Sequence, residues 1–366
     1  MLKKLFSTIV LWVSSLLFLA MDAHTQEQAN IPSLWETFTP MFDIGVAVEP
    51  HLLNDENTPH ILRHYRSLTA ENCMKPNALY RPDGRGHFEP ADRLVAFAKE
   101  HGLRLRGHTL VWHNQTPAGF FTDEAGNQLD KEALYARMEA YMTCVMEHFR
   151  DVVYCWDVVN EALADGGEET YRVESPWYKI CGKEFLLRAF QTAHRIDPDV
   201  RLYYNDYGLL NPDKRAKAVA MLKELLAADA PIFGVGIQGH WDIHTFSPQE
   251  LQKTIDAFAE LGLDVQITEL DMSVHHPGNR EAPDGEKWEY TSEIEARQAE
   301  VYAQVFEVLC RNADRISSVT FWGISDQYSW RNYFPKKNRP DYALPFDRNW
   351  SPKKGFYSIV ESFPKF

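Results

Sequence analysis

Short apolar runs alternate with longer stretches of helical periodicity along most of the chain. Eight runs rich in β-branched and aromatic residues predict buried strands at Phe42–Val48, Ser67–Cys73, Leu103–Val111, Val153–Val159, Val200–Asn205, Phe233–Gln238, Asp264–Thr268 and Ser318–Trp322. Between them, apolar residues at helical spacing predict amphipathic helices at Ala91–His101, Lys131–Phe149, Glu184–Arg195, Asp213–Ala228, Pro248–Leu261 and Glu293–Arg311.

This alternation predicts an α/β protein built of βαβ units around a parallel sheet. Nearly every run ends in a polar or aromatic cluster: Glu49, Glu71 and Asn72, His108, Asn160 and Glu161, Asn205 and Asp206, Gln238 to His240, Glu269, and Trp322. A doubly wound open sheet gathers its ligand groups at one switch point, whereas a closed barrel uses the carboxyl ends of all its strands. We therefore expect a (β/α)8 TIM barrel with its active site at these strand ends.

The first 23 residues have the pattern of a secretory signal peptide, which would be removed from the mature protein. Lys3 and Lys4 precede an apolar run from Leu5 to Ala20, and a polar stretch follows Ala23. A membrane anchor is the alternative, but the run is shorter than the roughly 20 residues that a span requires. We expect export to the periplasm or the medium, and no later segment is apolar enough to span a membrane.

Residues 24–366 carry no repeat or Pro/Ser-rich linker, so we expect one catalytic domain. The longest polar stretch, His275–Trp288, is expected to be a surface loop over the cleft. Five cysteines (Cys73, Cys144, Cys155, Cys181 and Cys310) include no CxxC pair, which gives a disulfide framework or zinc site little support, although one or two bridges remain open.

The formal charge of −14 argues against nucleic acid as a partner, because nucleic-acid binding needs a basic surface. A neutral substrate suits this charge better than a polyanion. Aromatic residues make up 13% of the chain, which fits either a large core or flat platforms for sugar rings.

Two glutamates directly follow apolar strands, Glu161 after the fourth run and Glu269 after the seventh. A carboxyl group in that position is partly desolvated, so its pKa can be tuned for acid, base or nucleophilic work. Strands four and seven lie across a barrel mouth, where two such groups can flank one glycosidic bond. The alternative for each glutamate is a helix cap or a local ion pair.

The chain strongly resembles the glycoside hydrolase family 10 xylanases over about residues 35–363. The motifs that carry the resemblance stand at consecutive strand ends: Thr69–Lys75, Gly107–His113, Trp156–Ala162, Tyr204–Tyr207, Gly236–His240, Ile267–Asp271 and Phe321–Asp326. It implies retaining endo-1,4-β-xylanase activity without cofactor or metal, on xylan and xylo-oligosaccharides.

The same resemblance implies a role for each catalytic residue. Glu161 matches the general acid/base and Glu269 the nucleophile, while Asn160 would bind the 2-hydroxyl group of the attacked sugar. His240 and Asp271 match a chain in which Asp orients His and His bonds the nucleophile, which keeps Glu269 ionised. Glu161 faces no such donor in its motif and is expected to stay protonated.

The remaining matches are substrate-binding residues. On the non-reducing side of the cut these are Glu49, Asn72 and Lys75; around the attacked ring they are His108, Trp112, Gln115, Asn205, Gln238, Trp322 and Trp330. Tyr207 is expected on the leaving-group side. A purely structural role stays open for Trp112, Trp322 and Asn205, because aromatic residues near barrel ends are often core.

Other functions have weaker signals. Gly234–Gly239 formally matches the dinucleotide fingerprint, but a loop rather than a helix is expected to follow it. His240 with His244, and His275 with His276, lack the frame of a zinc protease. A β-1,4-glucanase or aryl-cellobiosidase is the alternative enzyme, and a catalytically silent sugar-binding protein is the alternative from another class. We expect a monomer.

Overall fold

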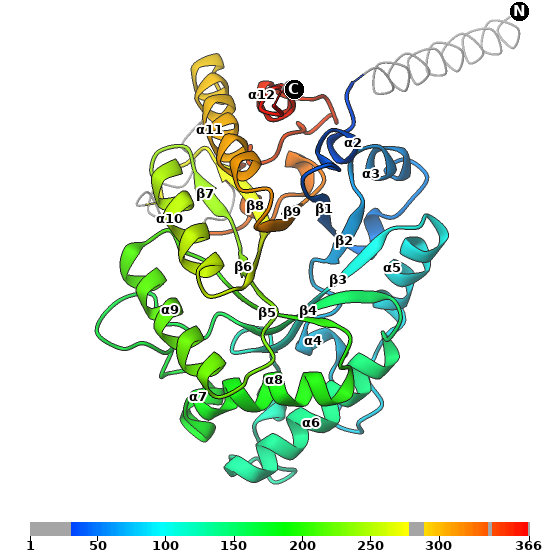
Figure 1. Ribbon diagram of the computed structural model, residues 1–366. Helices are drawn as coiled ribbons and strands as arrows, with labels where there is room; N and C mark the ends of the chain where they lie inside the picture. The colour runs from blue at the N-terminus through cyan, green and yellow to red at the C-terminus, as the bar shows by residue number, and fades with distance from the viewer. Residues whose placement is uncertain (1–30, 278–288, 336–338, 365–366) are drawn as a thin grey trace, which may run out of the picture.

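The strands of the computed structural model close into a ring (Figure 1). The structure describes residues 31–277, 289–335 and 339–364. The ring strands are β1 (Asp43–Val48), β2 (Ser67–Ala70), β3 (Arg104–Trp112), β4 (Val153–Asn160), β5 (Arg201–Asp206), β6 (Gly234–Ile237), β8 (Asp264–Ser273) and β9 (Ile316–Phe321). Parallel neighbours run β6-β5-β4-β3-β2-β1-β9-β8, and β6 pairs with β8 to close the circle. The predicted (β/α)8 barrel is confirmed.

Helices surround the barrel between successive strands (Figure 1). They are α2 (Leu34–Phe38), α3 (Thr58–His64), α4 (Pro76–Leu79), α5 (Glu89–Glu100), α6 (Lys131–His148), α7 (Pro176–Cys181), α8 (Glu184–Ile196), α9 (Pro212–Ala227), α10 (Pro248–Ala259), α11 (Ser292–Arg311) and α12 (Lys354–Glu361). The six predicted helices are all present, and four of them begin with a capping side chain. Asp130, Asn211, Ser247 and Thr291 each accept a backbone N–H at the start of a helix.

The structure corrects the strands next to the candidate site. The sixth predicted run ends early, and His240 begins a short strand, β7 (His240–Asp242), where the sequence predicted the end of one strand and then a loop. The seventh run continues to Ser273, so Glu269 and Asp271 lie inside β8. His240 lies opposite Asp271 across β7 and β8. A strand of this length depends on its distant partner, and its own residues carry too little periodicity to predict it.

An ion pair between neighbouring strands is buried in the interior of the barrel. Arg106 on β3 donates to both carboxylate oxygens of Asp157 on β4, and its Nε lies 3.1 Å from Gln266 Oε1. Neither Arg106 nor Asp157 is exposed to solvent. Asp157 Oδ2 also lies 2.8 Å from His108 Nδ1, so the pair links the barrel interior to a predicted substrate-binding residue.

Replacing Arg106 by Met is expected to lower the free energy of unfolding by about 3–5 kcal/mol, because it leaves the charge of Asp157 buried without its partner. Urea unfolding followed by circular dichroism measures this loss. Arg104→Met is the matched control, since Arg104 pairs with Asp43 at the surface and such pairs contribute at most about 1 kcal/mol. Equal losses in the two variants would contradict the expected role of the buried pair.

Three expectations concern the ends and the surface of the chain. The predicted signal peptide, 1–23, and most of the predicted loop His275–Trp288 lie outside the described residues. Among the residues that are described, no helix has the length and apolar character needed to cross a membrane. All five cysteines are free thiols in the structure, so the bridges that the sequence left open are not formed in it.

Candidate active site

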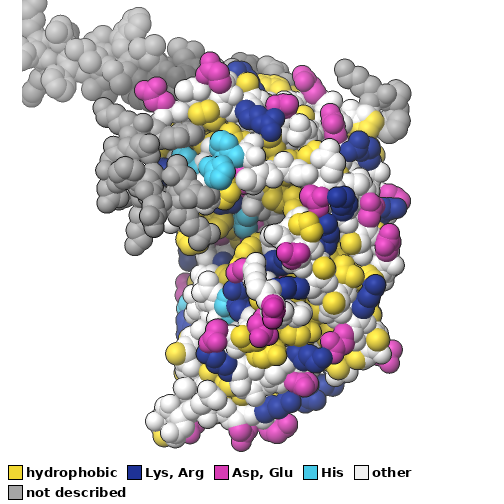
Figure 2. Space-filling model, turned by 90° about the vertical axis from the view of Figure 1, so that its left-hand side faces the viewer, with side chains coloured by type: hydrophobic (Ala, Val, Ile, Leu, Met, Phe, Trp, Pro, Cys, Tyr) yellow, Lys and Arg dark blue, Asp and Glu magenta, His cyan; other side chains and the backbone are white. Residues whose placement is uncertain are grey.

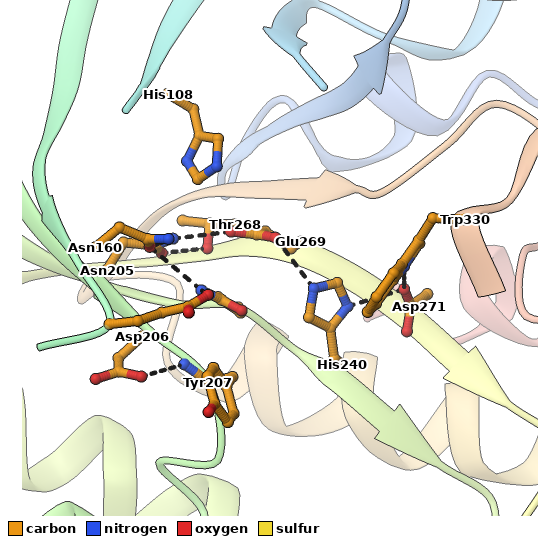
Figure 3. A network of polar contacts seen from close by, with 12 residues as sticks. His108, Asn160, Asn205, Asp206, Tyr207, His240, Thr268, Glu269, Asp271 and Trp330 are labelled. Carbon is orange, nitrogen blue, oxygen red and sulfur yellow. Dashed lines mark hydrogen bonds and ion pairs between the residues drawn. The ribbon is translucent and has the colours of Figure 1, made fainter. Parts of the chain in front are cut away.

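Side chains at the carboxyl ends of four strands form one connected network (Figure 3). Asn205 donates its Nδ2 group to Asn160 Oδ1 at 2.9 Å and to Glu269 Oε1 at 2.8 Å. Gln238 donates its Nε2 group to Glu161 Oε1 at 3.0 Å and to Asn160 Oδ1 at 3.3 Å. Glu161 and Glu269, which are far apart in the sequence, are thereby joined through amides that meet at Asn160.

Asn205 is held rigidly in this network. It is fully buried, and its Oδ1 accepts a hydrogen bond of 2.6 Å from Thr268 Oγ1. Gly236 on the neighbouring strand provides the space, because a Cβ there would lie 2.2 Å from Asn205 Oδ1. Asn160 is also buried, and its Nδ2 has no hydrogen-bond partner among the described residues. A buried donor needs a partner, so this group is available to an acceptor from outside the protein.

The carboxylate of Glu269 belongs to a relay that runs through His240 to Asp271 (Figure 3). His240 Nε2 lies 3.0 Å from Glu269 Oε2, and His240 Nδ1 lies 2.8 Å from Asp271 Oδ2. Trp330 donates its Nε1 to the same Asp271 oxygen at 2.8 Å, and Arg331 donates to the other one at 3.0 and 2.8 Å. Asp271 is thus fixed by three side chains while it orients His240.

The charges along this relay raise the pKa of His240 and lower the pKa of Glu269. Burial alone would lower the pKa of His240, but the charge and the hydrogen bond of Asp271 raise it to about 9. Burial alone would raise the pKa of Glu269, but the hydrogen bond from His240 and the nearby imidazole of His108 lower it to about 2. At neutral pH the relay therefore holds a cationic His240 between two ionised carboxylates, Glu269 and Asp271.

Replacing Asp271 by Asn is expected to raise the acidic limb of the kcat/KM profile by about one pH unit. The substitution removes the charge that keeps His240 protonated, and a lost hydrogen bond to a charged group is worth roughly 1.5–3 kcal/mol, against about 1.4 kcal/mol per pKa unit. This profile reports the free enzyme. Asp326→Asn is the control, because Asp326 is equally buried and pairs with Lys353 instead. An unchanged acidic limb in folded Asp271→Asn would exclude the relay.

Glu161 directly follows β4 with a left-handed φ of 57°. Contrary to the sequence-based expectation, it does have donors: Trp112 Nε1 lies 2.9 Å from Oε2 and Gln238 Nε2 lies 3.0 Å from Oε1. Trp112 ends β3 and Gln238 directly follows β6, so both donors are distant in the sequence and the local motif did not show them. Burial and the charge of Asp206 nevertheless outweigh the two hydrogen bonds and raise the pKa of Glu161 to about 7.

A second cluster lies beside this network. Asn72 donates its Nδ2 to Glu49 Oε1 at 2.5 Å, and Lys75 donates its Nζ to Asn72 Oδ1 at 3.0 Å. The ammonium group of Lys75 lies 5.2 Å from the ring centre of Trp112 and 6.0 Å from that of Trp322. The structure therefore brings together the three residues that were expected to bind the same side of the substrate.

The other predicted lining residues lie around the two clusters. The His108 ring meets Trp322 edge-on at 5.4 Å between ring centres. Gln115 has its Nε2 3.4 Å from Asn72 Oδ1, which places it with the second cluster rather than with the network around Glu269. Trp112 and Trp322 are both buried, so they contribute to packing as well as to the wall of the site.

Tyr207 lies among charged residues. Its hydroxyl group lies 2.7 Å from Asp165 Oδ2 and 3.0 Å from Arg172, and the Lys214 ammonium lies 3.7 Å from its ring centre. The sequence identified Tyr207 but not these partners.

Sequence reasoning assigned no role to three residues beside the site. Arg331 holds Asp271 and immediately follows Trp330, so a charged residue next to a predicted lining residue was an available signal. Asp206 follows Asn205 and acts electrostatically on Glu161. Glu71 precedes Asn72, and burial and the charge of Glu49 raise its pKa to about 7 against the opposing charge of Lys75. Both carboxylates stood in strand-end clusters, but nothing in the sequence showed which way they point.

The histidines that raised the question of a metal have other partners. His240 is bound to carboxylates, and His244 Nε2 lies 3.1 Å from the carbonyl oxygen of Val274. Across the described ranges, no three His, Cys, Asp or Glu side chains are grouped so that they could hold a metal ion. Gly234–Gly239 leads from β6 into β7, so the helix that a dinucleotide site requires does not follow it.

The structure combines a closed parallel barrel with two carboxyl groups near strand ends, one ionised and one with a raised pKa. This combination places the protein in the class of glycoside hydrolases that use a pair of carboxyl groups. The sequence profile of glycosyl hydrolase family 10 matches residues 33–362, and the chain belongs to this family.

Individual relatives agree with this assignment. The chain is 42% identical to a β-1,4-xylanase of Dictyoglomus thermophilum over 99% of its own length and 100% of the relative. It is 40% identical to a thermostable celloxylanase of Thermoclostridium stercorarium, over 91% and 88% of the two chains. The crystal structure of a Paenibacillus barcinonensis xylanase, complexed with a conduramine derivative, is similar with a TM-score of 0.87 and 38% identity, over 90% and 98% of the chains.

Proposed function

We propose that this protein is an endo-1,4-β-xylanase that cleaves internal xylosidic bonds with retention of configuration. The observation that carries the proposal is the unequal pair of carboxyl groups, with a pKa of about 2 for Glu269 and about 7 for Glu161. Retaining hydrolysis needs one ionised nucleophile and one protonated acid at the same bond. Membership of family 10 and xylanase relatives at about 40% identity support the substrate.

In the first step, the ionised Glu269 attacks the anomeric carbon while the bond to the leaving sugar breaks. Glu161 gives its proton to the leaving oxygen, so the leaving sugar departs neutral and Glu161 becomes a carboxylate. Glu269 then carries a covalent glycosyl ester. His240 and Asp271 are positioning residues here, because they hold Glu269 in its charged form before attack.

In the second step, water attacks the anomeric carbon and restores the carboxylate of Glu269. Glu161 takes the proton from that water and returns to its initial state, so one water is consumed for each bond cleaved. The unpartnered Nδ2 group of Asn160 supports a contact to the 2-hydroxyl group of the attacked ring. Glu49, Asn72 and Lys75 would bind hydroxyl groups of the sugar on the non-reducing side.

The surface agrees with a neutral polymer as substrate. On the described part of the face in Figure 2, Lys and Arg side chains are interspersed with Asp and Glu, and a polyanion finds no continuous basic area there. Hydroxyl-rich sugars instead need paired donors and acceptors beside aromatic walls, which the Glu49, Asn72 and Lys75 cluster provides between Trp112 and Trp322.

The decisive experiment compares products from unbranched xylan and from a β-1,4-glucan, with the first anomer observed by NMR. We expect xylo-oligosaccharides of mixed length that first appear as the β-anomer. Faster hydrolysis of glucan would favour the alternative, a β-1,4-glucanase. This alternative is tested because one of the relatives is a celloxylanase. An α-anomer would exclude retention, and no hydrolysis of either polymer would favour a silent sugar-binding protein.

We also propose that the protein is exported and monomeric. The charged, apolar and small-residue order of residues 1–23 supports export. N-terminal sequencing of the mature protein, with a cleavage expected near Ala20–Ala23, tests the first point, and light scattering tests the second.

A further inference from the structure

We propose that Asp206 and Lys214 form a positioning pair that sets how firmly Glu161 holds its proton. Asp206 favours the protonated form of Glu161, and Lys214 limits that effect. The side chains of Asp206 and Lys214 bind other protein groups, so both residues act on the reaction through Glu161. The inference rests on the proposed function, in which Glu161 is the acid/base.

Asp206 is a fully buried carboxylate at the end of β5. Its Oδ2 accepts a hydrogen bond of 2.5 Å from Tyr204 Oη, and its Oδ1 accepts one of 2.9 Å from the backbone N–H of Tyr207. Tyr204 Oη in turn accepts a hydrogen bond of 3.1 Å from the backbone N–H of Ala162, the residue after Glu161. One tyrosine hydroxyl therefore ties Asp206 to the segment that carries Glu161.

Lys214 supplies the opposing charge. It lies in the first turn of α9, is almost fully buried, and its Nζ lies 3.0 Å from Asp206 Oδ1 and 2.9 Å from Asp165 Oδ1. Asp165 is half-exposed and also pairs with Arg172 at 3.1 Å. Because Lys214 divides its charge between two carboxylates, it neutralises Asp206 only in part.

Other ionisable groups also lie near Glu161. Glu269 also carries a negative charge, yet His240 balances it and the covalent ester removes it during the reaction. Lys75 interacts with Glu161 through its charge, and Arg172 contacts the backbone oxygen of Glu161 at 3.3 Å rather than its carboxyl group. The neutral His113 lines the same small cavity as Glu161.

Asp206 is thus a negative charge that no step of the proposed reaction removes; burial raises its own pKa, and the charge of Lys214 opposes that shift. After burial, the charge of Asp206 is the largest cause of the raised pKa of Glu161, ahead of that of Glu269. Like charges in a buried site favour the neutral form of each partner. A general acid that must start protonated near neutral pH is stabilised by such a neighbour.

The pair is tested by two variants with opposite expected effects. In Asp206→Asn the pKa of Glu161 should fall by about one unit, since the like charge is gone. In Lys214→Met it should rise by a similar amount, because Asp206 then acts without compensation. The measurements are the basic limb of kcat/KM on a xylo-oligosaccharide, whose leaving sugar needs protonation, and a direct ¹³C NMR titration of the glutamate carboxyl groups, with Glu161 assigned from Glu161→Gln.

The control is Asp264→Asn. Asp264 is another strand-end aspartate that accepts a hydrogen bond from a tyrosine, Tyr203 Oη at 2.7 Å, but it begins β8 at the opposite end of the barrel. It should leave the pKa of Glu161 unchanged even if it costs stability. Shifts of the same sign in both test variants, or an unchanged pKa of Glu161 in either folded variant, would overturn the proposal. The NMR titration does not depend on turnover, so failure of the proposed function leaves this result readable.

Discussion

Glu269→Ala is expected to lower kcat on every substrate by about 10⁵-fold, since it removes the nucleophile and with it the covalent route. The loss should be the same for xylan and for aryl xylosides with good leaving groups, because attack at the anomeric carbon is needed whatever departs. Steady-state rates on a series of aryl xylosides measure this.

External azide provides the control for the Glu269→Ala variant. Removing the carboxylate leaves space on the face of the sugar from which Glu269 attacks, and a small anion there can displace the leaving group once. One displacement inverts the configuration, so the product should be the α-glycosyl azide. A rate on the most activated substrate close to that of the unchanged enzyme would assign the nucleophile to another residue.

The barrel could be predicted because its signals are local. Its strands are buried on nearly every residue, as in β8, where only Asp264 is partly exposed, and such strands appear in the sequence as short continuous apolar runs. Its longer helices pair an apolar stripe with a capping residue at the expected place, as Asn211 does for α9. Both signals are contained within one segment of chain.

The contacts of the site could be predicted only in part, because most of them join distant segments. His240 was identified, but its strand β7 depends on pairing with residues about thirty positions away. The donors to Glu161 come from Trp112 at the end of β3 and from Gln238 directly after β6. Arg331 reaches Asp271 from the loop after β9, and no spacing in the sequence connects them.

The different roles of the two glutamates arise from their neighbours rather than from the side chains themselves. Glu269 is buried and Glu161 is partly buried, and burial raises the pKa of each. A hydrogen-bonded His240 reverses that effect at Glu269, whereas the charge of Asp206 reinforces it at Glu161. Within one network, a glutamate can therefore serve as the ionised nucleophile at one position and as the general acid at another.

Glu161→Ala is expected to slow some substrates much more than others, whereas Glu269→Ala slows all of them equally. Protonation of the leaving oxygen contributes about 10²–10⁴-fold to the rate, so kcat/KM on xylan should fall by that factor. An aryl xyloside whose phenolate leaves without help needs little protonation in the first step and should lose least there. Its second step still lacks a base, so the glycosyl-enzyme should accumulate and produce a burst of phenol, which stopped-flow absorbance measures.

Azide again distinguishes the roles, now with the opposite stereochemistry. In Glu161→Ala it attacks the glycosyl ester on Glu269, and two displacements return the original configuration, giving a β-glycosyl azide and a faster steady state. The basic limb of the pH profile should also disappear, because the group whose pKa is about 7 is gone. A Glu161→Ala enzyme that lost the same factor on all leaving groups, with no burst and an intact basic limb, would remove Glu161 from the acid/base role.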